Sequence, residues 1–87
     1  MQGLSELVET ATAEIDAAAD LAALDGVRVA WLGKKGKVTA LLKSLGELPA
    51  DERPAAGQAI NHAKQDLMDR LNARRAELER EALEARL

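Results

Sequence analysis

Two glycines, Gly33 and Gly36, interrupt a sequence whose pattern is helical on both sides. The apolar residues before them recur at the alternating four- and three-residue spacing of a coiled-coil seam, and this spacing returns in the second half of the chain. Glycine is unfavourable inside helices and common where helices end. We therefore expect two long helical segments joined by a compact middle that contains a tight, exposed turn.

The composition also favours helices. Hydrophobic residues make up 47% of the 87 residues, but they are mostly Ala and Leu, and Phe, Tyr and Cys are absent. Without Cys there are no disulfides or Cys-based zinc sites, and a single His, His62, excludes a multi-His metal site. No apolar run approaches the roughly 20 residues that cross a bilayer, and no signal peptide is recognisable. We expect a small cytoplasmic all-α domain without metal, cofactor or membrane contact.

Helix-start and helix-stop signals divide the chain. Ser5 is the expected N-cap of the first helix, and Gly33 is expected to end it as a left-handed C-cap. Asp20 could cap a renewed helix and Gly26 could kink one, so the continuity of the first helix stays open. Thr39 is the approximate cap of a short helix. The expected elements are a helix over about 4–32, a turn at 33–37, a short helix over about 38–45, a connection at 46–53 and a long helix over about 54–86.

The two apolar seams predict how these helices pair. At 1.5 Å per residue the long segments would span roughly 43 and 50 Å. Two helices of similar length joined by a compact middle are expected to form an antiparallel two-helix coiled-coil hairpin. The turn at 33–37, which contains Lys34, Lys35 and Lys37, is expected near its tip and both chain ends at its base. The seams consist of Leu4, Val8, Ala11, Ile15, Ala18 and Ala22, and then of Ile60, Ala63, Leu67, Leu71, Leu78 and Ala82.

The charge is distributed unevenly. The net charge is −3, yet no acidic residue lies between Asp25 and Glu47, and that interval holds five bases. A local field of one sign steers the encounter with a polyanion even when the total charge is slightly negative. Nucleic-acid phosphate is the simplest partner for such a cluster. The predicted contact residues are Arg28, Lys34, Lys35, Lys37 and Lys43, extended by Arg74 and Arg75 of the last helix.

Other kinds of site are less well supported. The spacing from Gly33 to Gly36 matches the G-x-x-G loop of a KH domain, but that domain needs a sheet and this chain has no convincing strand. A phosphate-binding P-loop is excluded by its spacing. The carboxylates are best explained as solvated partners of the arginines, and Trp31 as an apolar anchor rather than a base-stacking platform. No catalytic residue is predicted.

A longer string of residues carries a family resemblance. It comprises Trp31-Leu32-Gly33-Lys34-Lys35-Gly36, Val38-Thr39, Glu52-Arg53-Pro54-Ala55-Ala56-Gly57, Ile60-Asn61 and Lys64. Together these closely resemble the N-terminal region of bacterial phenylalanyl-tRNA synthetase α subunits, and the resemblance extends over nearly the whole chain. Trp31 is a departure, since the family usually places Tyr there. The family's class II catalytic domain lies downstream, and nothing of it is present in these 87 residues.

The resemblance implies an antiparallel coiled-coil arm that contacts tRNA, carried by an α2β2 enzyme whose other partner is the β subunit. ATP, magnesium and phenylalanine would belong to the catalytic domain, so the segment itself is not expected to be catalytic. Two alternatives stay open. One is a structural coiled-coil module that assembles subunits, or self-associates, without touching RNA. The other is the similar arm of a seryl-tRNA synthetase, against which the string from Leu32 to Lys64 argues.

Overall fold

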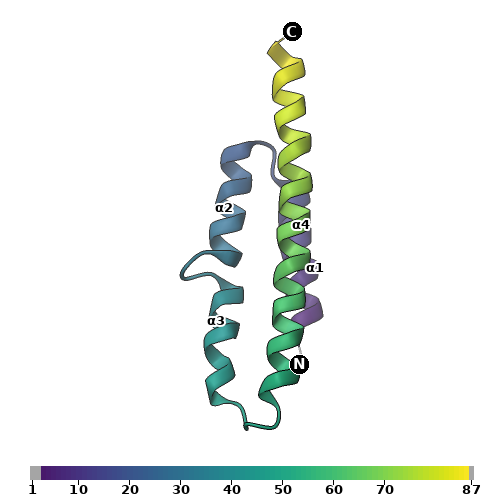
Figure 1. Cartoon of the computed structure of the whole chain (residues 1–87). Coiled ribbons are helices and arrows are strands. Elements are labelled where there is room, and N and C mark those ends of the chain that lie inside the picture. Colours follow the sequence, from purple (N-terminus) through teal and green to yellow (C-terminus); the bar gives the residue numbers. More distant parts are fainter. Residues whose placement is uncertain (1–2, 87) are drawn as a thin grey trace.

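The computed structural model describes residues 3–86, which form helices and short connections and contain no strand. The all-α class is therefore confirmed for this part of the chain. The short helix and the last helix lie close to their expected positions, whereas the region expected to be one long helix is divided. The elements are α1 (Leu4–Ala17), α2 (Leu21–Leu32), α3 (Lys37–Ser44), the 3-10 turn η1 (Leu45–Glu47) and α4 (Arg53–Arg86) (Figure 1).

The chain breaks between α1 and α2, and Asp20 begins the second helix. Its carboxylate accepts a hydrogen bond from the backbone N–H of Ala23 at 2.7 Å, so Asp20 is the N-cap of a new helix. Ala18 ends α1 with an extended backbone, φ −63° and ψ 119°. The single helix expected over about 4–32 is thus wrong, although alanine is the strongest helix former. Gly26, in contrast, does not interrupt α2.

The break reverses the chain, so three rows of helix lie side by side (Figure 1). α1 and α4 run in the same direction: Leu4 and Val8 of α1 line a groove with Ala59 and Ala63 of α4. α2 and α3 run back in the opposite direction along α4. The antiparallel pairing therefore joins α4 to the α2–α3 row. Both halves of the predicted helix over 4–32 pack against α4, but the predicted antiparallel direction holds for α2 and is wrong for α1.

The turn that follows α2 is not at the tip, because α3 continues along α4 in line with α2. The connection after η1 forms the lower end of the molecule, and the turn lies partway along its length rather than at the tip (Figure 1). The first residues of α1 lie near the start of α4, while the end of α4 is at the opposite end of a body 56 Å long. The predicted placement of the turn at the tip, with both chain ends at the base, is therefore corrected.

The core runs along the α4 seam. α4 contributes more buried residues than any other helix, because α1, α2 and α3 all pack against it. Ala22 and Ala82, both predicted seam residues, are exposed: Ala22 belongs to the renewed helix, and α4 extends beyond the other helices near Ala82. The buried apolar side chains are Ala11, Ile15, Ala18, Leu24, Trp31, Val38, Ile60, Ala63, Leu67, Leu71 and Leu78.

The start of α1 differs from the expected cap, and a side chain fixes the start of α4. α1 has Gly3, not Ser5, as its N-cap, with a left-handed φ of 83° that glycine adopts without strain. Toward the same end of the molecule, Arg53 closes the connection into α4. Its guanidinium donates to the carbonyl oxygens of Leu48 and Gly46, each at 3.0 Å. These bonds tie the start of α4 to the segment that precedes it.

Candidate nucleic-acid interface

The turn between α2 and α3 is closed by hydrogen bonds to a single carbonyl oxygen. The oxygen of Gly33 accepts from the backbone N–H of Gly36 at 2.9 Å and from the Thr39 hydroxyl at 2.7 Å. Thr39 thus stabilises the turn rather than capping α3, whose N-cap is Gly36. Lys34 and Lys35 occupy the centre of this turn and are exposed. The turn therefore presents two adjacent ammonium groups on a backbone that is fixed at both ends.

Both glycines are required because backbone atoms approach them closely. A Cβ on Gly33 would lie 2.5 Å from the carbonyl oxygen of Val29, and one on Gly36 would lie 2.6 Å from the carbonyl carbon and oxygen of Trp31. Neither glycine has a positive φ, so the predicted left-handed C-cap at Gly33 is wrong. The backbone after α2 instead folds tightly against the last turn of that helix, where a side chain has no space.

Trp31 anchors this turn from the core side. Only 3% of its surface is exposed, which excludes it as an open platform for stacking a base in this conformation. Its indole N–H donates to a carboxylate oxygen of Glu14 on α1 at 3.1 Å. The ammonium of Lys37 lies 4.3 Å from the ring centroid, within the range of a cation–π contact. Trp31 therefore connects α1 to the basic turn and orients one of the predicted contact residues.

Four of the predicted contact residues lie on the turn and α3. Lys34, Lys35, Lys37 and Lys43 are all exposed. None of these lysines has a carboxylate within ion-pair distance among residues 3–86, where the ion pairs are Arg28–Asp25, Arg70–Asp66 and Arg74–Glu77. A lysine without an internal partner keeps its full charge available to an external anion. The structure thus brings the lysine part of the predicted cluster onto one connected segment.

Arg28 is partly engaged. Its Nε and Nη2 donate to the same carboxylate oxygen of Asp25 at 3.1 and 2.9 Å. The pair is well exposed, with 45% of the Arg28 side chain accessible, so its contribution to stability is small. The contact orients the guanidinium and leaves nearly half of the side chain accessible.

Arg74 forms hydrogen bonds within the fold instead of projecting freely into solvent. One of its terminal nitrogens donates to the carbonyl oxygen of Ala18 at 2.8 Å, and the other to Glu77 at 2.9 Å. Its side chain is only 20% exposed. Arg74 therefore joins α4 to the end of α1, while the neighbouring Arg75 is exposed and faces α2.

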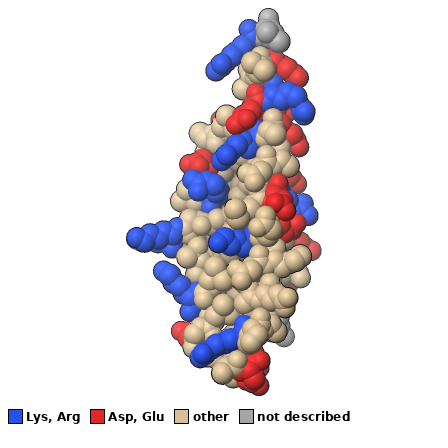
Figure 2. All heavy atoms as spheres, in the orientation of Figure 1, with Lys and Arg blue, Asp and Glu red and all other residues tan. Residues whose placement is uncertain are grey.

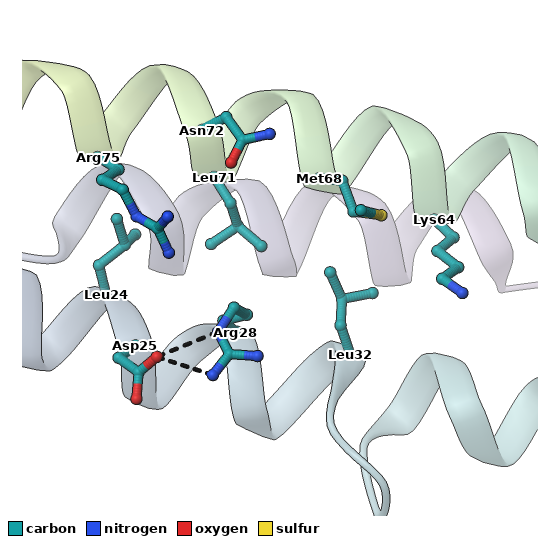
Figure 3. A pocket seen from close by; sticks show the side chains of 9 residues that line it. All are labelled: Leu24, Asp25, Arg28, Leu32, Lys64, Met68, Leu71, Asn72 and Arg75. Atoms are coloured by element: carbon teal, nitrogen blue, oxygen red, sulfur yellow. Dashed lines mark hydrogen bonds and ion pairs between the residues drawn. The ribbon is translucent and has the colours of Figure 1, made fainter.

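A groove between α2 and α4 brings Arg28 and Arg75 together with Lys64, which the sequence interpretation did not include among the contact residues (Figure 3). Lys64 and Arg75 are eleven residues apart and share one helix face with Met68 and Leu71, a spacing that could have indicated a common surface. That Arg28 lies opposite them depends on how α2 pairs with α4. This pairing is a tertiary property that the periodicity of either helix leaves open.

The space-filling view shows the resulting charge distribution (Figure 2). Basic side chains project from the side formed by α2 and the turn, and others lie along the upper part of α4. Acidic side chains gather mainly on the right flank of this view and near its lower end. The visible face therefore has a basic side, with the exposed lysines of the turn adjacent to the groove that contains Arg28 and Arg75.

Comparison with known proteins identifies the family. Residues 19–87 match the model for the N-terminal domain of class II aminoacyl-tRNA synthetases. The chain belongs to this family. The match begins just before the N-cap of α2 and includes the basic turn, the groove and all of α4.

Individual relatives give a more specific comparison than the family model. The whole chain is 58% identical to phenylalanine–tRNA ligase α subunits of Edwardsiella ictaluri, Klebsiella pneumoniae subsp. pneumoniae and Escherichia coli. The resemblance to the N-terminal region of phenylalanyl-tRNA synthetase α subunits is thus confirmed. The chain spans 27% of the length of these relatives.

Residues 3–86 offer neither a membrane span nor a metal site. No helix in this range is long and apolar enough to cross a membrane. Within the same range, no cluster of three or more His, Asp or Glu residues has the arrangement of a metal site.

Proposed function

We propose that this chain is a tRNA-binding arm of a phenylalanine–tRNA ligase α subunit and that it holds tRNA through backbone phosphates. The observation that carries the proposal is the basic interval 28–43, which contains no acid and whose exposed lysines have no ion-pair partner among residues 3–86. Phosphate contacts of this kind supply affinity and position without reading base sequence.

The contact residues fall into groups with different roles. Lys34 and Lys35 are the primary phosphate ligands because the turn holds them outward and apart from the core. Lys37 and Lys43 extend the basic surface along α3, while Arg28 and Arg75 extend it into the groove between α2 and α4. Arg74 is a secondary candidate, since its guanidinium already binds Ala18 and Glu77.

The remainder of the function belongs to the parent enzyme. The relatives are named as phenylalanine–tRNA ligase α subunits. We infer that the parent of this chain joins phenylalanine to tRNA with ATP and magnesium, in the cytoplasm, as an α2β2 assembly with a β subunit. We propose that the segment over residues 3–86 takes no direct part in that chemistry. Its proposed contribution is to hold the tRNA while a separate catalytic domain acts on it.

Charge reversal in the full-length α2β2 enzyme tests the proposal. Replacing both Lys34 and Lys35 with Glu should weaken tRNA binding and flatten its salt dependence, by about 0.7–0.9 units of slope for each phosphate that the variant no longer binds. The matched control replaces both lysines with Arg, which keeps the charge and should retain binding. Activation of phenylalanine in the absence of tRNA should be the same in all three proteins. Unchanged tRNA affinity in the Glu variant would exclude the proposal.

A structural coiled-coil module is the second candidate, and one observation favours it. Leu83 on the projecting end of α4 is 60% exposed, which leaves an apolar side chain available to another subunit. Against it, the seam residues Ile15 and Leu67 are already buried within a single chain. An assembly module would sediment as a dimer when isolated, and its lysines at 34 and 35 could be replaced without loss of tRNA affinity.

A further inference from the structure

The groove between α2 and α4 combines an apolar floor with a basic rim. Leu24 and Leu71 form buried parts of the floor, and Met68, 39% exposed, is open to solvent there. Figure 3 shows side chains from both helices directed into this space, with Arg75 toward one end and Lys64 and Leu32 toward the other. Its volume is about 220 Å³.

The charged residues that line the groove favour the binding of an anion. Three cations line it, Arg28, Lys64 and Arg75, against a single carboxylate. That carboxylate, Asp25, is already paired with Arg28 at 2.9 Å. The occupant should therefore carry negative charge at the rim and a flat or apolar group for the floor. A nucleotide has both parts in one unit, because its phosphate is anionic and its base is a planar ring that can pack on an apolar surface.

Two polar details fit a nucleotide. Asp25 holds the Arg28 guanidinium from one edge, so its flat face stays available, and arginine planes are surfaces on which unstacked bases pack. Asn72, the uncharged polar residue of the lining, offers both a hydrogen-bond donor and an acceptor to a base edge. The lone Trp is buried, so the guanidinium and Met68 are the groups available for stacking.

Position provides the link to RNA. Leu32 lines the groove and directly precedes Gly33, the first residue of the basic turn. A strand whose phosphates lie on Lys34 and Lys35 therefore lies beside the end of the groove that Leu32 and Lys64 line. We propose that the groove receives one unstacked nucleotide of the bound tRNA, with its base on Met68 and Leu71 and its two flanking phosphates directed toward the cations at the two ends of the groove, Lys64 at one and Arg75 at the other. This proposal rests on the tRNA-binding function proposed above.

A photo-reactive side chain in the floor tests the placement. In the full-length α2β2 enzyme, Met68 is replaced by benzoylphenylalanine, and the same change at Leu83 is the control, because Leu83 is exposed on α4 outside the groove. Illumination with tRNA should attach RNA at position 68, at one unpaired nucleotide identified by a reverse-transcription stop, and not at position 83. An adduct at 68 with protein instead of RNA would assign the groove to a protein contact and overturn the proposal.

Affinity gives an independent readout. Met68→Glu places a carboxylate on the floor and should weaken tRNA binding by about fivefold or more, the effect expected when one base no longer stacks. Leu83→Glu adds the same charge to the same helix and should leave affinity unchanged. Unchanged affinity in Met68→Glu would overturn the groove proposal while leaving the arm intact, provided that Lys34→Glu/Lys35→Glu weakens binding. If that double variant also binds normally, the proposed function itself fails.

Discussion

At the scale of single residues, close backbone approach explains the glycines of the turn better than unusual dihedral angles do. Gly33 and Gly36 have ordinary negative φ values, yet an added Cβ on either would meet backbone atoms at less than 3 Å. Backbone atoms cannot move aside as a flexible side chain can. A glycine in the sequence can mean either a positive φ or a close approach of backbone atoms. The structure shows that the second reason applies at Gly33 and Gly36.

An alanine substitution should have opposite effects at a glycine that backbone atoms crowd and at a glycine with open space around it. Gly36→Ala should lower the free energy of unfolding by about 1–3 kcal/mol, because its Cβ would lie 2.6 Å from the Trp31 carbonyl group. Gly26→Ala should raise it by up to about 1 kcal/mol, since Gly26 lies inside α2 and no atom is near its added Cβ. Urea denaturation of both variants checks this, and equal effects at the two sites would contradict the account.

Adjacent arginines on α4 also separate by role. Arg74→Ala should destabilise the chain by about 1.5–3 kcal/mol, because a partly buried guanidinium loses its charged hydrogen bonds to Ala18 and Glu77. Arg75→Ala should change stability by no more than about 0.5 kcal/mol, since Arg75 is exposed. Thermal and chemical unfolding measure both. A stability loss that is equal in the two variants would show that Arg74 does not connect α4 to α1.

At the scale of helices, local signals and burial decide different features. The N-cap residue Asp20 was recognisable in the sequence, as were the start of α4 near Pro54 and the short helix after the glycine turn. The sequence left open whether the chain breaks at Asp20, because the alanines before it favour helix. The break is favoured by burial: reversal of the chain lets both Ile15 and Leu24 pack in the core. The groove could not be predicted from the sequence either, because Lys64 and Arg28 line the same groove only through the packing of α2 on α4.

Asp20 should therefore be a measurable determinant of the break. Asp20→Ala removes the acceptor for the Ala23 N–H and should destabilise the chain by about 1 kcal/mol. Asp20→Asn keeps a capping oxygen and should be nearly neutral. Equilibrium unfolding of the two variants provides the comparison. If alanine were as stable as asparagine, the carboxylate would not be acting as a cap.

At the scale of the whole molecule, the packing of α2 and α3 in line along α4 decides which surface the basic residues occupy. The body is 56 Å long, and the turn lies along its side (Figure 1). Under the proposed function, tRNA therefore rests against the side of the rod, where the lysines of the turn lie next to the groove of α2 and α4. A hairpin with the turn at its tip would offer the lysines alone, because α4 could not bring Lys64 and Arg75 beside Arg28.

Fluorescence can distinguish the two arrangements, because the chain has one Trp and no Cys. A nitroxide on Ala13→Cys would lie roughly 27 Å from Trp31 along one continuous helix. In the folded-back arrangement the neighbouring Glu14 is hydrogen-bonded to the indole at 3.1 Å, so the label should quench Trp31 strongly. A label on Ala85→Cys, near the projecting end of α4, should leave the emission unchanged. Quenching at position 13 that is independent of protein concentration would place the contact within one chain, whereas equal emission from the two labelled variants would contradict the reversal.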